Sequence, residues 1–217
     1  MGWKASCILS NERAPGYLGM MPPHDPQRAR RLIEDLGLGP CRSRGMTTFD
    51  EGIYPDCLVV GAYDGAAVVG DPQIINAGFS PDGDPLLGRA LALFPKAAIL
   101  RVGLHSVVNL WTYAYFEGGR LLRAYGGAAD EGVLVDEGEW LPEERPHFER
   151  SVVRDGQRFF YADINGQMEK FDDSAYGVTL AFEMIGKFFG CRPDRVHPQI
   201  DPLVLTMEAF ERVPPKR

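Results

Sequence analysis

His105 and Ser106 are adjacent and are of the types that hydrolases use as general base and nucleophile. Neighbouring side chains of a β-strand point to opposite faces of the sheet, so the two cannot hydrogen-bond directly if this region is a strand. The chain also lacks the G-x-S-x-G turn that presents a nucleophilic serine. What remains is one alternative hypothesis: a hydrolase-type enzyme that uses His105 as the base in a pocket lined by a hairpin.

The alternation of residue types around His105 indicates a candidate ligand site. If one strand ran through the region, a polar and aromatic face would stand opposite an aliphatic face. An arginine beside amide and aromatic side chains can hold a carboxylate, a phosphate or a planar ring. The candidate ligand-binding residues on this face are Arg101, His105, Asn109, Trp111 and Tyr113.

A structural interpretation competes with the ligand site. The aromatic residues would pack under a helix, while Arg101 and His105 would satisfy nearby carbonyl or carboxylate groups. One uninterrupted strand would exceed the usual strand length, and any break would disturb the alternation. Strand length therefore favours the structural interpretation.

The segment ADEGVLVDEGEWLPEER, residues 129–145, is the most acidic in the chain. Its carboxylates precede a single basic residue, and Asp136, Glu137 and Glu139 form a candidate surface for a basic protein partner. Calcium and magnesium prefer such oxygen ligands, but the D-x-[DN]-x-[DN]-G spacing is absent, so no metal site is predicted. A solvated hairpin is the plainer interpretation of the same residues.

Composition excludes several classes of function. The formal net charge is −7 with a pI of about 5.2, which opposes binding to nucleic acid. No apolar run approaches the roughly 18 residues of a membrane helix, and no signal peptide is recognisable, so a cytoplasmic protein is expected. The phosphate-loop and G-x-G-x-x-G patterns are missing, and the four cysteines are widely spaced, so no cofactor is predicted.

Three helices and several strands must position these residues. Asp25-Pro26 supplies an N-cap and a first-turn proline for a helix from Pro26 to Leu36. The segment PLLGRALALFPK predicts a short second helix. A third spans Ser174–Phe189, with Glu183 and Lys187 spaced for an ion pair.

Glycine-containing turns dominate the rest. A first strand is expected at Trp3–Ser10, hairpins turn at Asp64-Gly65 and Gly118-Gly119, a meander covers Ser151–Phe171, and a short β-run covers Leu203–Met207. These signals predict one α+β domain over residues 1–217: a mainly antiparallel sheet of several hairpins, with some mixed pairing left open, covered by a few helices and followed by a short, Pro-rich basic C-terminal tail.

The stretch HSVVNLWTYAYFEGGRLLRAYGGAADEGVLVDEGEWLPEE, with the opening MGWKASCIL and the late KFFG, resembles a family of uncharacterised bacterial proteins known only as a domain of unknown function. The resemblance rests on the H-S-V-V-x-x-x-x-Y-A run and the following D-E-G turn. It implies a soluble bacterial domain and brings no activity, cofactor or catalytic residue. Asn109 stands where the family pattern often has an acid.

We expect a soluble, non-catalytic binding or regulatory domain of an accessory or immunity type. Its partner would be a protein with a basic surface or a small ligand near Arg101, His105 and Trp111.

Overall fold

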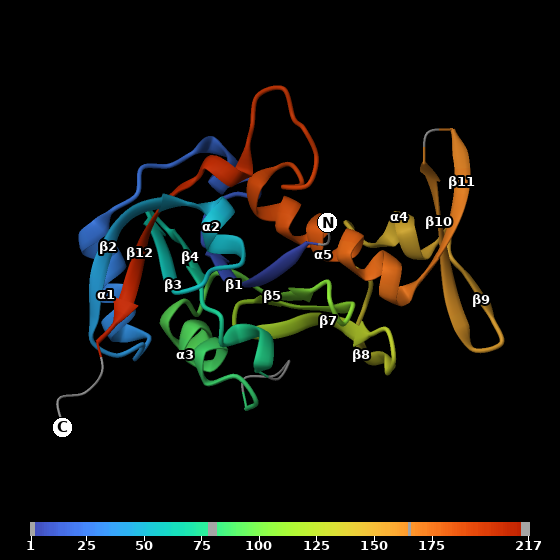
Figure 1. Cartoon of the computed structure of the whole chain (residues 1–217), viewed down its shortest axis with the longest axis horizontal. Helices are drawn as coiled ribbons and strands as arrows, with labels where there is room; N and C mark the ends of the chain where they lie inside the picture. The colour runs from blue at the N-terminus through green and yellow to red at the C-terminus, as the bar shows by residue number, and fades with distance from the viewer. Residues whose placement is uncertain (1–2, 78–81, 165, 214–217) are drawn as a thin grey trace.

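The computed structural model describes residues 3–77, 82–164 and 166–213. Two antiparallel sheets and several helices make up an α+β fold, as predicted (Figure 1). The larger sheet has nine strands in the order β2-β12-β3-β4-β1-β5-β6-β7-β8. Its strands are β1 (Lys4–Asn11), β2 (Cys41–Thr48), β3 (Leu58–Tyr63), β4 (Ala66–Gly70), β5 (Ala98–His105), β6 (Leu110–Glu117), β7 (Arg120–Ala128), β8 (Gly132–Gly138) and β12 (Thr206–Arg212).

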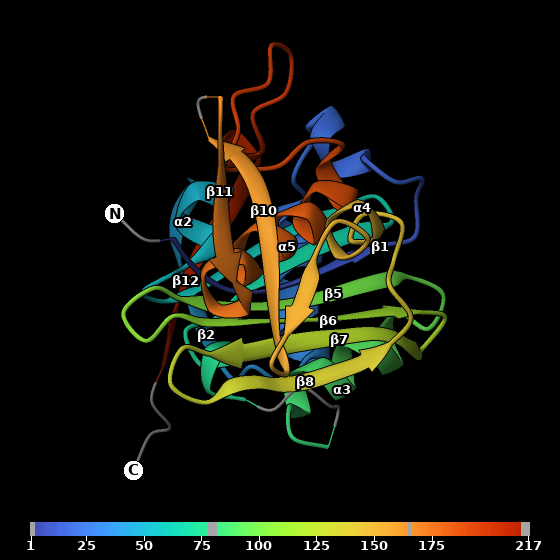
Figure 2. The same ribbon diagram turned by 90° about the vertical axis from the view of Figure 1, so that its right-hand side faces the viewer.

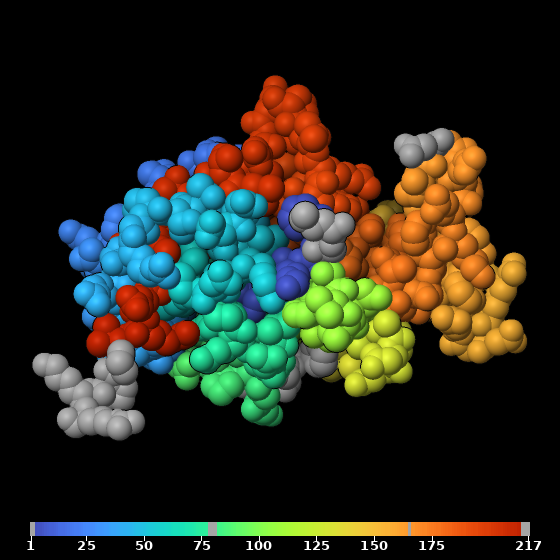
Figure 3. All heavy atoms as spheres, viewed as in Figure 1, coloured from blue at the N-terminus to red at the C-terminus, as the bar shows by residue number. Residues whose placement is uncertain are grey.

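The smaller sheet has three strands in the order β11-β10-β9. They are β9 (Val152–Arg154), β10 (Gln157–Ile164) and β11 (Gln167–Asp172). These strands run across the direction of β5 to β8 (Figure 2). In the space-filling view they form one end of the molecule (Figure 3). This sheet confirms the meander predicted for Ser151–Phe171.

Helices cover both faces of the large sheet. The α-helices are α1 (Pro26–Asp35), α2 (Phe49–Ile53), α3 (Pro85–Leu93), α4 (Arg145–Phe148) and α5 (Asp173–Phe189), and the 3-10 turns are η1 (Tyr17–Met20), η2 (Ile74–Asn76) and η3 (Pro202–Val204). α2 and α5 pack on one face, and α1 and α3 on the other. Side chains of both orientations are therefore buried in the central strands.

Local chemistry explains where the elements begin and turn. The Asp25 carboxylate accepts hydrogen bonds from the backbone N–H groups of Gln27 (2.9 Å) and Arg28 (3.0 Å), which caps α1 as predicted. The β6–β7 hairpin turns at Gly118 and Gly119, whose φ angles of 56° and 75° suit a tight two-residue turn. Both predictions are confirmed.

Two segments differ from the sequence prediction, and part of a third lies outside the described residues. The sequence pattern makes no prediction for Cys41–Thr48, which is strand β2, because an exposed edge strand lacks apolar alternation. The β-run predicted at Leu203–Met207 is confirmed only in part: Leu203 and Val204 belong to the 3-10 turn η3, whereas Thr206 and Met207 begin strand β12, which lies between β2 and β3. The last four residues of the predicted basic tail, 214–217, lie outside the described residues.

The predicted ion pair between Glu183 and Lys187 does not form. Glu183 instead pairs with Arg192 at 2.8 Å, and Lys187 reaches Glu143 at 2.7 Å. Contacts with other segments therefore outweigh the local helical spacing. In the described part of the chain, no helix is long and apolar enough to cross a membrane.

Candidate functional site

The structure divides the predicted ligand-binding residues between two faces of the sheet. A turn at residues 106–109 reverses the chain, so β5 and β6 pair with each other instead of forming one long strand. Leu104 lies opposite Trp111 and Val102 opposite Tyr113, which places both aromatic residues on the face that carries α5. Arg101 points to the α3 face, so the prediction of one shared face is wrong.

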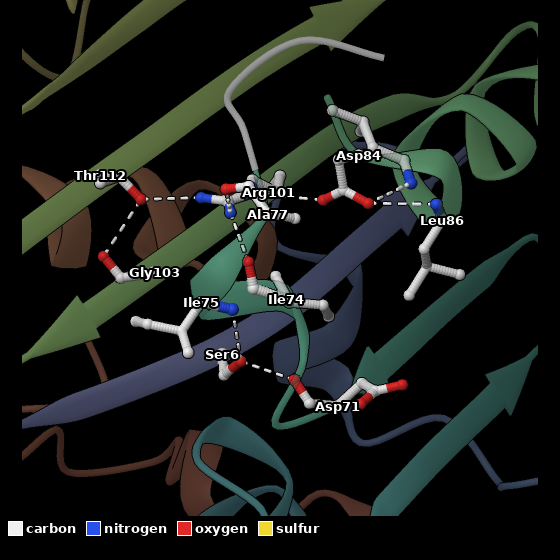
Figure 4. A network of polar contacts seen from close by, with 11 residues as sticks. Ser6, Asp71, Ile74, Ile75, Ala77, Asp84, Leu86, Arg101, Gly103 and Thr112 are labelled. Carbon is white, nitrogen blue, oxygen red and sulfur yellow. Dashed lines mark hydrogen bonds and ion pairs between the residues drawn. The ribbon is translucent and has the colours of Figure 1, made fainter. Parts of the chain in front are cut away.

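Arg101 fixes a loop to the sheet (Figure 4). Its guanidinium, which is 1% exposed, donates to Thr112 Oγ1 (2.8 Å), to the Ala77 carbonyl (2.7 Å) and to the Ile74 carbonyl. Asp84 lies 3.5 Å from Nε and also caps α3. Burial lowers the pKa of Arg101, while Asp84 opposes this shift. These contacts agree with the structural interpretation of Arg101.

His105 ends β5 and is separated from the other candidates. Its ring lies edge-on to the ring of Tyr54, with ring centroids 6.4 Å apart. The Nδ1 atom is buried without a hydrogen-bond partner, and no described residue forms an ion pair or hydrogen bond with the imidazole. Asn109 lies in the turn with a φ of 42°. This arrangement supplies no carboxylate to orient His105, so it does not support the hydrolase alternative.

Trp111 and Tyr113 lie in an aromatic cluster beneath α5. Trp111 packs against Tyr125 with ring centroids 4.6 Å apart, and Tyr113 contacts Tyr125 edge-on. Both candidate residues are fully buried. The Tyr113 hydroxyl donates to Glu144 at 2.5 Å, and burial together with this carboxylate raises its pKa well above the usual value.

A buried ion pair beside this cluster was not predicted. Arg123 Nε donates to Glu144 at 2.9 Å, and Nη1 donates to Asp136 at 2.6 Å. Burial alone would lower the pKa of Arg123, but Glu144, Tyr113 and Asp136 together outweigh burial and the pKa is raised. Through these contacts, Arg123 on β7 is joined both to the segment before α4 and to strand β8. Only the folded structure shows it, because 21 residues separate the two partners.

The acidic candidates lie along and just beyond β8, the last strand of the large sheet. Asp136 is bound to Arg123 and pairs across the sheet with Tyr125, whereas Glu137 pairs with Ala124 and so faces the opposite side. Glu139 follows the strand and is exposed. The three carboxylates therefore do not form one flat patch. Asp136 and Glu137 lie on opposite faces of the edge strand β8, and Glu139 lies just after its end.

The outer edge of β8 combines backbone N–H and C=O groups that pair with no other strand of the described chain, exposed apolar side chains and negative charge. In the described part of the chain, β7 is the one strand that pairs with β8. Val133 and Leu134 are 42% and 49% exposed. The β7–β8 hairpin lies at the surface beside the smaller sheet, where its yellow atoms adjoin the orange ones (Figure 3).

A cavity of about 420 Å³ lies between this hairpin and the start of α5. It is lined by Gly132, Val133 and Gln157 together with two adjacent aspartates, Asp172 and Asp173. Asp173 accepts a hydrogen bond from the Tyr125 hydroxyl, and burial raises its pKa. The backbone N–H of Ala175 lowers the pKa of Asp172, which caps α5. The acidic character of β8 thus continues into the cavity.

Residues 5–207 match a family of unknown function, DUF6928. The chain belongs to this family. It matches no curated protein and no solved structure. Membership of DUF6928 therefore carries no activity or binding partner to this chain. In the described residues, no group of three or more His, Cys, Asp or Glu side chains is arranged to hold a metal ion.

Proposed function

We propose that this DUF6928 chain is a non-catalytic binding domain of a regulatory or accessory type, and that β8 binds an extended, basic segment of a partner protein. The observation that carries the proposal is the free edge of β8. It ends a nine-stranded sheet, exposes Val133 and Leu134, and is surrounded by carboxylates.

Backbone hydrogen bonds would supply much of the binding energy. The outer edge of a terminal strand presents N–H and C=O groups that an added strand can pair with. The seven residues of β8 span roughly 23 Å at about 3.3 Å per residue. Val133 and Leu134 lie where the pairing register of β8 shifts, and both would contact apolar side chains of the added segment.

Negative charge selects the partner. Asp130, Glu131, Glu137 and Glu139 flank or follow the exposed apolar residues, and no Lys or Arg occurs from 129 to 144. Opposite charges across an interface speed association, and like charges oppose it. Two β8 edges would repel each other, whereas a segment with Lys or Arg would be attracted.

The cytoplasm is the proposed location. Cys7, Cys41, Cys57 and Cys191 are all free thiols, which suits a reducing compartment.

A photo-crosslinking residue at position 133 tests the proposal in native lysate. The same residue at position 46 on β2 is the control, because Met46 is also exposed on an edge strand. We expect crosslinks at position 133 to segments that carry Lys or Arg, reduced by Glu137→Gln with Glu139→Gln. Equal crosslinking at both positions, or crosslinks to acidic segments, would overturn the proposal.

A second copy of the chain is the competing occupant. The opposite edge strand, β2, carries the exposed residues Arg42 and Arg44 and could pair with β8 of another molecule. Sedimentation of the purified chain separates the two cases. A constant monomer mass between 5 µM and 500 µM, approximate limits set to span weak association, would support a different protein as partner. Concentration-dependent growth would favour self-association and contradict the proposal.

A further inference from the structure

We propose that a second site, at the end of the sheet where β6 turns into β7, binds a small polyhydroxylated anion carrying a phosphate or carboxylate group. The site is a cavity of about 510 Å³. It lies between the loop after β1, the start of β5, the β6–β7 hairpin and the C-terminal part of α5. It is separate from the partner surface proposed on β8.

Four cations from four segments line this cavity. Arg13 follows β1, Lys96 precedes β5, Arg120 begins β7 and Lys187 lies in the last turns of α5. Such a concentration of positive charge is unexpected in a chain whose formal net charge is −7. Bringing cations together is unfavourable unless negative charge compensates them. Carboxylates of the protein compensate two of the four, and a bound anion would compensate the other two.

Two of the cations already have partners. Arg13 forms an ion pair with Asp64, and Lys187 lies 2.7 Å from Glu143 and 5.4 Å from the centre of the Tyr115 ring. Lys96 and Arg120 are exposed and form no ion pair with any described residue. These two side chains are therefore the ones available to contact an anionic group directly.

Two carboxylates and two buried aromatic residues of the cavity lining determine which groups the uncharged part of the ligand can carry. Glu12 and Glu117 also line the cavity, and Glu117 accepts a hydrogen bond from the Tyr115 hydroxyl. A carboxylate accepts hydrogen bonds, so it would favour hydroxyl groups on the ligand. Tyr115 and Phe188 lie behind these groups and are almost fully buried. A hydroxylated molecule with one anionic group satisfies both sets of charges.

The cavity walls are held in place without a ligand. The Asn11 side chain donates to the Ala14 carbonyl at 3.0 Å and accepts from the Arg13 N–H at 2.9 Å, which orders the loop that carries Arg13. On the opposite wall, Glu117 and Arg120 face each other across the two-residue hairpin turn. A preformed site loses less conformational freedom on binding.

Isothermal titration with glucose 6-phosphate, gluconate and glucose tests the inference. We expect binding of at least one of the two anions, with neutral glucose at least about tenfold weaker, since a tenfold change corresponds to one lost charged contact of about 1.4 kcal/mol. The tighter anion identifies whether phosphate or carboxylate is the preferred group. Failure of both anions to bind, or equal binding of glucose, would overturn the inference.

Matched variants locate the site. Lys96→Gln with Arg120→Gln removes the two available cations, and Arg154→Gln with Arg195→Gln removes two exposed cations elsewhere for the same change in net charge. The first pair should weaken anion binding at least about tenfold, and the second should leave it unchanged. Equal weakening by both pairs would show an effect of net charge alone and contradict the assigned cavity. Unfolding temperatures of both variants check that they fold.

Discussion

Arg123 and Glu144 form an ion pair in which neither side chain has exposed surface, with Nε and Oε1 2.9 Å apart. Glu144 also accepts the Tyr113 hydroxyl and, through its second oxygen, the backbone N–H of Leu141. One carboxylate thus joins β6, β7 and the segment before α4. Removing Glu144 would leave the buried guanidinium of Arg123 with the partly exposed Asp136 as its remaining ion-pair partner, and breaking a buried pair in this way is strongly destabilising.

We predict that Glu144→Gln destabilises the protein by about 3–5 kcal/mol, because Arg123 then stays charged without its buried partner. Urea unfolding at pH 7 measures the change. Replacing Arg123 with Met at the same time should recover part of the loss. A loss below about 1 kcal/mol, typical of exposed pairs, would contradict the burial of this ion pair.

Gly177 marks the contact between α5 and Trp111. A Cβ atom at this position would lie 2.1 Å from Cδ2 of the indole, so Gly177→Ala should force α5 away and cost about 1–3 kcal/mol or more. Gly186 in the same helix is the control, because its Cβ would meet no atom closer than 3.5 Å. Gly186→Ala should stabilise the protein by about 0.5–1 kcal/mol. Equal thermal shifts for both variants would contradict the contact.

Asp172 and Asp173 are adjacent but should respond to pH in opposite ways. The pKa of Asp172 is lowered, so its stabilising effect is present above the unfolded value of 3.8 and is lost as pH falls through the folded pKa. Asp172→Ala should therefore cost about 1 kcal/mol at pH 7 and less near pH 3.

The pKa of Asp173 is raised by burial, so ionisation opposes folding as pH rises through the folded pKa. Asp173→Asn should consequently leave stability at pH 7 unchanged or raise it, since the amide oxygen can still accept from Tyr125. Denaturant unfolding from pH 3 to 7 compares both variants. Parallel pH profiles for the two would refute the difference in their environments.

His24 should make stability depend on pH between about 5 and 7. Its Nδ1 accepts the Ala62 N–H at 3.2 Å, and its Nε2 lies 3.7 Å from Glu208. Burial lowers the pKa of His24, and Glu208 opposes this shift. The neutral ring therefore stabilises the fold fully above the unfolded value of 6.5, and this effect is lost as pH falls from 6.5 through the folded pKa.

His24→Gln should consequently reduce the amount by which the free energy of unfolding falls between pH 7 and pH 5. Unfolding free energies of both proteins measure the difference, since the remaining histidines are common to both. An unchanged slope would mean that His24 does not cause the pH dependence.

Much of the fold could be predicted because its signals are local. The Asp25 cap, the Gly118-Gly119 turn and the 151–171 meander each depend on a few neighbouring residues. Strand β2 was missed because an exposed edge strand does not need apolar alternation.

The candidate ligand site could not be predicted in the same way. Its arrangement depended on whether residues 106–109 continue a strand or turn, and that single turn exchanges the faces of all the residues that follow. Arg123 and Glu144, like the cations of the cavity near β7, come from distant segments and converge only when the sheet assembles.

Hydrogen exchange at the backbone amides of β8 tests the central claim most directly. The ligand is a ten-residue peptide of alternating Lys and Val, and a peptide of alternating Glu and Val is its control. We predict that the basic peptide slows exchange in β8 and leaves β2 unchanged, that Glu137→Gln with Glu139→Gln removes the effect, and that Asp50→Asn with Glu51→Gln retains it. Unchanged exchange in β8, or equal protection by both peptides, would contradict the binding of basic segments at this edge.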